Sequence, residues 1–487
     1  MKLIGLFAGE KFNHHSIALI HKNSSITYLA FEEKIFSTIQ TLSDIGIKRR
    51  NKVAILSENS PEFVMLIFSL WRLGAIPIPL NLKLLPKEIE ELITFAHCDF
   101  LLTDDSSFEL INSKKIPKHR IPNGNEKAAS KTFPEIDFTI EDTAAIIFTS
   151  GSTGKPKGVM LSFNNLFQSA LTGDQIFKHA DGDRWLASLP FYHVGGFSII
   201  TRAFFFGAAL ILPNSLSAEQ LKEEIENQKP TLTSFVSTQL KRLIELGVKP
   251  NKELRHILLG GGFLDAELVE KAISSGWKIS KSYGSTETSS FAAALTYEEF
   301  NKKRQSAGKA LTPNKILIVD EKKNPLPPNH SGEIAVKGES VAKGYLHNIE
   351  ETNKKFKGKI YYSGDFGYLD DEGYLFVEAR RNDLIISGGE NINPIEVENE
   401  IIKHPKVLEV SVLGIEDNEW GYIVTAAVVL KNKNEFTLDE LKEFLKDKLP
   451  GYKHPKKIFI LDNLPKTEMG KVQKEKIREI INSNKID

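Results

Sequence analysis

The stretch "IIFTSGSTGKPKGVML", residues 146–161, decides the fold class and most of the expected chemistry. An apolar run ends in Thr149, and the next ten residues supply three glycines, two lysines and three hydroxyls. Glycines let backbone N–H groups turn inward around an anion, while hydroxyls add donors and a lysine adds charge. This stretch therefore predicts a buried strand followed by a phosphate-binding loop. The residues assigned to the loop are Thr149, Ser150, Gly151, Ser152, Thr153, Gly154 and Lys155.

Two other interpretations of the loop are weaker. A flexible surface loop would not need a buried strand leading directly into it. A Walker loop requires Gly-Lys-Ser/Thr at the start of a helix, whereas Pro156 follows Lys155 here. We expect the loop to bind the outer phosphates of a nucleotide without adopting Walker geometry.

Composition excludes several classes of protein. A chain of 487 residues should form two or more compact units. Its 63 basic and 63 acidic residues cancel, so the charge balance indicates no nucleic-acid partner and no membrane surface. The single cysteine, Cys98, excludes an internal disulfide framework and a Cys-rich zinc site. With no signal peptide and no apolar run long enough to cross a bilayer, we expect a cytoplasmic protein.

Helical and extended patterns alternate along the chain. Phe31, Ile35, Ile39 and Leu42 recur at helical spacing, and "NKVAIL" at 51–56 is typical of a buried strand. Ser60 and Pro61 then have the character of a helix cap and first helical position. This alternation predicts an α/β protein with largely parallel sheets.

The character of the sequence changes around residues 380–395. Beyond this point, "VLEVSVLGI" and "VTAAVVL" predict strands, and Thr437 with Glu440 predicts the start of a helix. We place a domain boundary near Asn382. Residues 1–381 then form a large N-terminal body of packed, mostly parallel sheets, and residues 382–487 form a small α/β C-terminal domain.

Four further motifs follow the loop in order: "HILLGGG" (256–262), "KSYGSTETSS" (281–290), "YYSGD" (361–365) and "LPKTEMGKVQKE" (464–475). Taken singly, most of these are typical of polar turns or solvated surface. As an ordered series spanning roughly residues 28–475, they resemble the adenylate-forming superfamily of acyl- and aryl-CoA ligases, luciferases and peptide-synthetase adenylation domains.

The resemblance implies a role for each motif. Tyr283 can stack on a base, Thr286 can donate to a phosphate, and Glu287 can hold Mg²⁺ through oxygen. In the family, the glycines before the tyrosine approach adenine, the acid of the third motif binds ribose, and the last lysine is catalytic. The nucleotide-binding residues implied are Gly261, Gly262, Tyr283, Gly284, Thr286, Asp365 and Arg380.

The implied reaction joins two anions. A carboxylate attacks the α-phosphate of ATP, an acyl-AMP forms, and coenzyme A then displaces AMP. We assign catalysis to Thr149, His193, Glu287 and Lys471, with Glu287 also the metal ligand. In the family, a mobile C-terminal domain rotates between the two steps. This implies a thiol channel at Gly388 and Gly389 and a hinge at Asn382.

This chain departs from the family pattern at two positions near the hinge. The hinge residue is usually Asp or Lys, but here it is Asn382. Asparagine tolerates unusual backbone angles, so a hinge remains the prediction. Ala379 stands where the family usually has glycine.

The acyl pocket is expected in "SLPFYHVGGFSIITR", residues 188–202, with a further contribution from residues 231–240. The resemblance implies that Tyr192 and His193 gate the carboxylate, although a purely structural histidine is an alternative. The Gly195–Gly196 pair is expected to leave space beside them. Arg202 would suit a substrate with a second carboxylate, but a solvent-facing or internally paired arginine is equally consistent with the sequence.

Within the superfamily, "LPFYHVGGFSIITR", "TSFVSTQLKRLIE" and "YGSTETSS" resemble the o-succinylbenzoate–CoA ligases of menaquinone synthesis. This implies formation of 2-succinylbenzoyl-CoA, AMP and diphosphate from 2-succinylbenzoate, ATP and CoA. The alternatives are another aryl- or medium-chain acyl-CoA ligase, or an adenylation enzyme that loads a carrier protein. Whether identical chains associate stays open.

Overall fold

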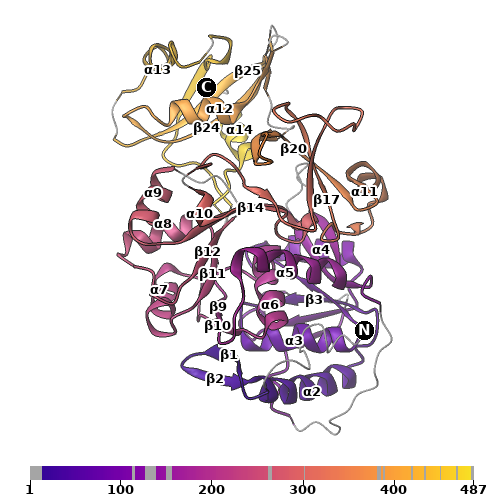
Figure 1. Cartoon of the computed structure of the whole chain (residues 1–487). Helices are drawn as coiled ribbons and strands as arrows, with labels where there is room; N and C mark the ends of the chain where they lie inside the picture. The colour runs from indigo at the N-terminus through magenta and orange to yellow at the C-terminus, as the bar shows by residue number, and fades with distance from the viewer. Residues whose placement is uncertain are drawn as a thin grey trace. The chain divides into compact units, whose positions relative to one another are not determined.

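The computed structural model describes two compact units of the chain (Figure 1). Their bounds are Met1–Gly260, Leu264–Ile316 and Ala335–Tyr362 for the first unit, and Gly261–Phe263, Leu317–Ile334 and Ser363–Asp487 for the second. Within these, the described residues are 14–111, 116–126, 139–149, 156–260, 266–300, 302–380, 385–387, 390–417, 420–432, 435–449, 451–467 and 470–483. The predicted boundary at Asn382 lies outside the described residues and stays a prediction.

The first unit contains a nine-stranded sheet in the order β15-β14-β13-β12-β11-β9-β10-β1-β2. From β13 to β1 all neighbours are parallel, while β14, β15 and β2 add antiparallel edges. The strands are β1 (Ile17–His21), β2 (Ser24–Thr27), β9 (Arg184–Leu186), β10 (Ala209–Leu212), β11 (Leu232–Phe235), β12 (His256–Leu259), β13 (Ile279–Tyr283), β14 (Ala293–Leu295) and β15 (Lys309–Ala310).

The first unit also contains two smaller sheets. One is all parallel, in the order β4-β3-β5-β6, and the other is antiparallel, in the order β18-β8-β7. Their strands are β3 (Lys52–Leu56), β4 (Ile76–Pro79), β5 (Phe100–Thr103), β6 (Lys118–Arg120), β7 (Thr143–Thr149), β8 (Lys157–Ser162) and β18 (Gly344–Tyr345). The prediction of an α/β fold with largely parallel sheets is confirmed.

Helices connect these strands. They are α2 (Tyr28–Asp44), α3 (Pro61–Arg72), α4 (Pro86–Ala96), α5 (Phe163–Phe177), α6 (Val194–Phe206), α7 (Ala218–Asn227), α8 (Ser237–Glu245), α9 (Ala266–Ser274), α10 (Tyr297–Phe300) and α11 (Ile349–Lys355). A single 3₁₀ turn, η1 (Thr286–Thr288), follows β13. Short strand β19 (Phe356–Lys357) follows α11.

Local sequence explains where the first helices start and which face they bury. The periodic residues Phe31, Ile35, Ile39 and Leu42 are all buried on one face of α2. Helix α3 begins as predicted, because the Ser60 side chain accepts a hydrogen bond from the Phe63 N–H at the first turn. Helices α2 and α3 lie side by side in Figure 1.

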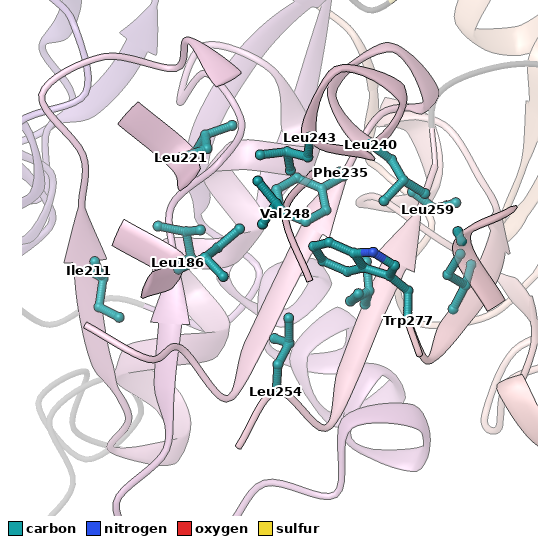
Figure 2. Close-up of a cluster of buried hydrophobic side chains, with 14 of the residues drawn as sticks. Leu186, Ile211, Leu221, Phe235, Leu240, Leu243, Val248, Leu254, Leu259 and Trp277 are labelled. Carbon is teal, nitrogen blue, oxygen red and sulfur yellow. The ribbon is translucent and has the colours of Figure 1, made fainter. Parts of the chain in front are cut away.

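A buried core lies between the nine-stranded sheet and the helices α7, α8 and α9 (Figure 2). The cluster includes Trp277, which is fully buried and contacts Phe235 at a ring-centroid distance of 6.4 Å. Side chains of a strand point alternately to its two faces, so Ile257 and Leu259 of β12 both point into this cluster. The core is therefore formed on the face of the sheet that these helices cover.

Three strands lie partly in the first unit and partly in the second: β16 (Lys315–Val319), β17 (Gly332–Lys337) and β20 (Ile360–Leu369). Strand β20 forms an antiparallel hairpin with β21 (Leu375–Arg380). A C-terminal sheet has the order β23-β22-β25-β24, with β26 on β25. Its strands are β22 (Ile385–Ser387), β23 (Glu390–Ile392), β24 (Val407–Asp417), β25 (Gly421–Leu430) and β26 (Lys457–Ile460).

Helices α12 (Pro394–Ile401), α13 (Leu438–Leu445) and α14 (Lys474–Ser483), with the 3₁₀ turn η2 (Gly451–Lys453), belong to the same C-terminal part. Helix α13 begins as the sequence predicts, because Thr437 accepts a hydrogen bond from the Glu440 N–H. Leu441 and Leu445 are buried in the C-terminal core. This part is the small α/β domain expected from the sequence.

Across the described residues, no helix combines the length and the apolar character that a membrane crossing requires.

We expect Leu243→Ala to lower the free energy of unfolding of the first unit by about 2–5 kcal/mol, because Leu243 is fully buried in the core of Figure 2 and truncation leaves a cavity. Leu246→Ala is the matched control: Leu246 follows the same helix but is 39% exposed, so a loss of about 1 kcal/mol or less is expected. Urea denaturation followed by tryptophan fluorescence measures both. Equal losses would contradict the assignment of this core.

Candidate functional site

Strands β7 and β8 present the two ends of the predicted phosphate loop. Thr149 is the last residue of β7 and pairs in register with Lys157, the first residue of β8. The loop residues Ser150, Gly151, Ser152, Thr153, Gly154 and Lys155 lie outside the described residues. The strand predicted to lead into the loop is therefore present.

Lys157, the second lysine of the motif, has a structural partner. Its Nζ lies 2.7 Å from Glu351 Oε1, and it also lies over the Tyr345 ring at 5.2 Å. Burial opposes the charged form of Glu351, but the hydrogen bond and charge of Lys157 lower the pKa of that carboxyl below its ordinary value. Lys157 thus ties the end of the β7–β8 hairpin to helix α11.

Glu287 lies in η1, shortly after β13, and the residue is buried. Tyr345 Oη donates a hydrogen bond to Glu287 Oε1 at 2.8 Å, and the Ala342 N–H donates to the Glu287 carbonyl at 2.8 Å. Burial, followed by the charge of Glu287 and this hydrogen bond, raises the pKa of Tyr345, which keeps the phenol protonated as a donor. The neighbouring Thr286 is also buried.

Tyr283 ends β13, and Gly284 follows it at the point where another segment crosses closely. A Cβ on Gly284 would lie 2.3 Å from the Phe291 Cα and 2.4 Å from the Ser290 carbonyl oxygen. Glycine is therefore required for backbone packing at this position. The glycines Gly261 and Gly262, predicted to approach adenine, lie outside the described residues, although β12 does end directly before Gly260.

Helix α6 starts beside the predicted acyl pocket. His193 is its N-cap residue, and the His193 and Tyr192 rings lie 4.7 Å apart. The prediction that Gly196 leaves space here is wrong, because a Cβ on Gly196 would lie 2.1 Å from the Pro190 carbonyl oxygen. Because Gly196 has no side chain, α6 can pack closely against the backbone of Pro190. Gly195 is less restricted, since a Cβ at this position would lie 3.3 Å from Leu189 Cδ1.

Arg202 lies in the middle of α6 and is 1% exposed, which excludes a solvent-facing side chain. Its Nη2 donates to Ser290 Oγ at 3.0 Å, and the guanidinium lies over the Phe291 ring at 4.5 Å. Among the described residues, the structure gives Arg202 no carboxylate partner and leaves Nε without a hydrogen bond. Burial lowers the pKa of Arg202 to about 9, so the side chain still carries a charge at neutral pH.

In the second unit, the β20–β21 hairpin brings together two residues predicted to bind the nucleotide. Asp365 and Arg380 are direct partners in the register of the two strands. The Asp365 N–H donates to Ser363 Oγ at 3.0 Å, and the Gly364 N–H donates to Glu333 Oε1 at 3.0 Å. These residues are 15 positions apart in sequence, and strand pairing makes them neighbours.

Lys471 is exposed in a turn closed by its own backbone. Its N–H donates to Thr467 Oγ1 at 3.2 Å, and its carbonyl accepts from the Thr467 N–H at 2.7 Å. Lys471 lies shortly before α14 in the second unit. The predicted channel residues Gly388 and Gly389 and the hinge Asn382 lie outside the described residues. Ala379 pairs with Phe366 in the hairpin.

Several residues that shape the site were not predicted. Tyr345 is 58 positions from its partner Glu287. Asn59 fixes the segment before α6, donating to the Leu189 carbonyl and accepting from the Phe191 N–H, both at 2.9 Å. Because these contacts join distant parts of the chain, no local pattern in the sequence signals them.

The donors around Glu287 fit a magnesium ion held together with a nucleotide. Glu287 supplies a buried carboxylate, and Mg²⁺ prefers oxygen ligands. Over the described part of the chain, no three His, Cys, Asp or Glu side chains group as a complete metal site. Proteins usually bind Mg²⁺ through one or two carboxylates together with substrate phosphates, so one buried glutamate is the arrangement expected.

The family comparison matches both parts of the chain. The AMP-binding enzyme family matches residues 8–346, and the AMP-binding enzyme C-terminal domain matches residues 396–471. The first match alone covers more than half of the chain.

Individual proteins with similar sequences and structures give the same result. The 2-succinylbenzoate–CoA ligase of Bacillus mycoides (strain KBAB4) is 35% identical over 463 residues, covering 94% of this chain and 95% of the relative. The solved o-succinylbenzoate CoA synthetase (MenE) of Bacillus subtilis, in complex with the acyl-adenylate intermediate OSB-AMP, has a TM-score of 0.87 at 33% identity, covering 95% of each chain. ATP-bound MatB from Rhodopseudomonas palustris has a TM-score of 0.91 at 27% identity, covering 99% of this chain and all of that one. On these findings, this chain belongs to the AMP-binding enzyme family.

Proposed function

We propose that this chain is a 2-succinylbenzoate–CoA ligase, which converts 2-succinylbenzoate, ATP and CoA into 2-succinylbenzoyl-CoA, AMP and diphosphate in menaquinone biosynthesis. It is an AMP-forming acid–thiol ligase that uses ATP, magnesium and coenzyme A. The observation that carries the choice of acid is the similarity to 2-succinylbenzoate–CoA ligases along nearly the whole chain. The single cysteine suits the reducing cytoplasm, where we propose that it works.

The first step must overcome repulsion between the substrate carboxylate and the phosphates of ATP. A cation about 4 Å from a developing charge offsets roughly 4 kcal/mol at an effective dielectric constant of 20. In our proposal, Thr149 and Lys155, with the amides of the loop, bind the diphosphate leaving group. Lys471 bridges the substrate carboxylate and the α-phosphate.

Glu287 would hold the magnesium ion, which supplies positive charge beside the phosphates. Tyr345 then has a role in this proposal: its hydroxyl donates a hydrogen bond to Glu287 Oε1 and so fixes the orientation of the carboxylate. Thr286, which precedes Glu287 in the chain, would donate to phosphate. Burial of Glu287 excludes competing water from the carboxylate, which strengthens its electrostatic interactions.

Nucleotide binding would involve residues of three motifs. We propose that Tyr283 stacks on adenine and that Gly261 and Gly262 also approach the base. Gly284, which has no side chain, would let the backbone pass close to the base. Asp365 would accept hydrogen bonds from the ribose hydroxyls, with Arg380 beside it. Their direct pairing in the hairpin supports a shared role.

The second step transfers the acyl group to the thiol of coenzyme A. We propose that the C-terminal domain, residues 382–487, turns about Asn382, which withdraws Lys471 and presents Gly388 and Gly389 along the pantetheine arm. The thiol attacks the acyl carbon, the carbon–oxygen bond to AMP breaks, and the thiol proton passes to solvent.

The acyl pocket would lie at the start of α6. Tyr192 and His193 border the reacting carboxylate in this proposal, with Gly195 beside them. Arg202 would bind the succinyl carboxylate. The charge of this guanidinium is buried, and no described carboxylate offsets it, which favours recruitment of an anionic group from the substrate.

The overall proposal is tested by incubating the purified chain with ATP, Mg²⁺, CoA and one acid at a time. The panel contains 2-succinylbenzoate, benzoate, a phenolic acid and a medium-chain fatty acid. Mass spectrometry should show the thioester of 2-succinylbenzoate as the dominant product. A thioester from another acid would reassign the substrate, and an acyl-AMP that never reacts with free CoA would indicate loading of a carrier protein.

Lys471→Ala should reduce adenylate formation by at least about 10²–10³-fold, because a preorganised cation at the reacting phosphate is lost. Thioester formation from supplied 2-succinylbenzoyl-AMP should stay largely intact. Lys476→Ala, at an exposed position of α14, is the control and should leave both steps unchanged. Equal loss of both steps in Lys471→Ala would refute the assigned role.

Arg202→Met removes the buried charge while retaining much of the side-chain volume. We expect the ratio of kcat/KM for 2-succinylbenzoate over benzoate to fall about 10–100-fold, the range for a hydrogen-bonded charge pair. Arg184→Met is the control, because Arg184 starts β9 and pairs with Glu253. An unchanged ratio in Arg202→Met would remove this arginine from the pocket.

A further inference from the structure

Two consecutive non-glycine residues directly after η1 have positive φ angles. Ser289 has φ 56° and ψ 43°, and Ser290 has φ 103°. Residues other than glycine rarely adopt such backbone angles. Each residue in this conformation costs of the order of 1–3 kcal/mol, so it persists only where the surrounding structure holds it in place. The strain lies two and three residues after Glu287.

Helix α5 provides one part of the support. The Ser169 Oγ donates to the Ser289 carbonyl at 2.5 Å. One turn earlier on the same face, the Asn165 amide donates to the carbonyls of Glu339 and Val341, both at 2.8 Å. Helix α5 therefore binds both the strained turn and the segment 339–342.

The two segments also bind each other. The Ser289 Oγ donates to the Ser340 carbonyl at 2.7 Å, and the Ala342 N–H donates to the Glu287 carbonyl at 2.8 Å. Ser169, Ser289 and Ser340 are all 2% exposed or less. Every residue from 339 to 342 thus offers a backbone group to α5 or to the segment that carries Glu287.

We propose that Ser169 and Ser289 are positioning residues for the reaction: they hold the strained turn so that Glu287 faces the metal–nucleotide complex. This rests on the proposed function, in which Glu287 is the magnesium ligand. Neither serine touches substrate. The Ser169 hydroxyl fixes the peptide group of Ser289, which follows Glu287, and the Ser289 hydroxyl joins this turn to Ser340, while Tyr345 fixes the Glu287 carboxylate.

The test compares two buried helical serines. Ser169→Ala removes the bond to the strained turn. Ser69→Ala is the matched control, since Ser69 is fully buried on α3 and its Oγ also donates to backbone carbonyls, those of Met65 and Ile35. Both variants should lose similar thermal stability, but only Ser169→Ala should affect the metal site.

Metal affinity is read without turnover. Mn²⁺ is titrated into enzyme saturated with α,β-methylene-ATP, and bound Mn²⁺ is followed by electron paramagnetic resonance. Ser169→Ala should weaken Mn²⁺ binding about fivefold, the effect of one hydrogen bond. The Mg²⁺ concentration for half-maximal diphosphate release should rise by the same factor, while the KM for the acid stays constant.

Ser289→Gly is the second variant, for the case in which Ser169→Ala fails to fold. Glycine relieves the positive φ but loses the bond to Ser340, so stability should change little while Mn²⁺ binding weakens. Wild-type Mn²⁺ affinity in a folded Ser169→Ala or Ser289→Gly variant would overturn the proposal. If wild-type enzyme forms no AMP with any acid, the proposed function fails instead, which is a separate result.

Discussion

A carboxylate buried away from water is costly unless its oxygens and its surroundings are hydrogen-bonded, and the region around Glu287 is organised by this constraint. Tyr345 approaches the carboxylate, and the chain before Tyr345 binds the Glu287 backbone. Helix α5 in turn fixes both segments. The stability of this arrangement comes from satisfied backbone groups, which explains why a turn with two strained residues persists there.

The nine-stranded sheet provides both a buried core and the strand ends at which the candidate site residues lie. The six central strands of the nine-stranded sheet are parallel, so their carboxyl ends lie along one edge, where ligands of open α/β sheets bind. Tyr283 and the start of η1 lie at the end of β13, and the segment before α6 follows the end of β9. Opposite faces of these strands are buried under helices, which leaves the strand ends as the place for polar chemistry.

Much of this was predictable from local sequence. The helical spacing of Phe31 and its partners predicts α2, the Ser60–Pro61 pair predicts the start of α3, and Thr149 lies at a strand end as expected. Such features depend on residues a few positions apart. The apolar sequence around Arg202 also indicates a buried helix, so the burial of that arginine could have been inferred from "FSIITRAFFF". The Ser169–Ser289 contact, 120 positions apart, and the packing of Gly196 on Pro190 depend on tertiary structure and leave no local pattern.

The β20–β21 hairpin has a consequence for how this enzyme tolerates changes in chain length. Asp365 and Arg380 are register partners because the turn at residues 370–374 sets the pairing of β20 with β21, with one irregularity beside Gly367. Inserting or deleting one residue in that turn would shift the register of the two strands, so that Asp365 would no longer pair with Arg380. The length of this turn is therefore constrained, and its shape also depends on Asp370, whose carboxylate accepts hydrogen bonds from the N–H groups of Glu372 and Tyr374.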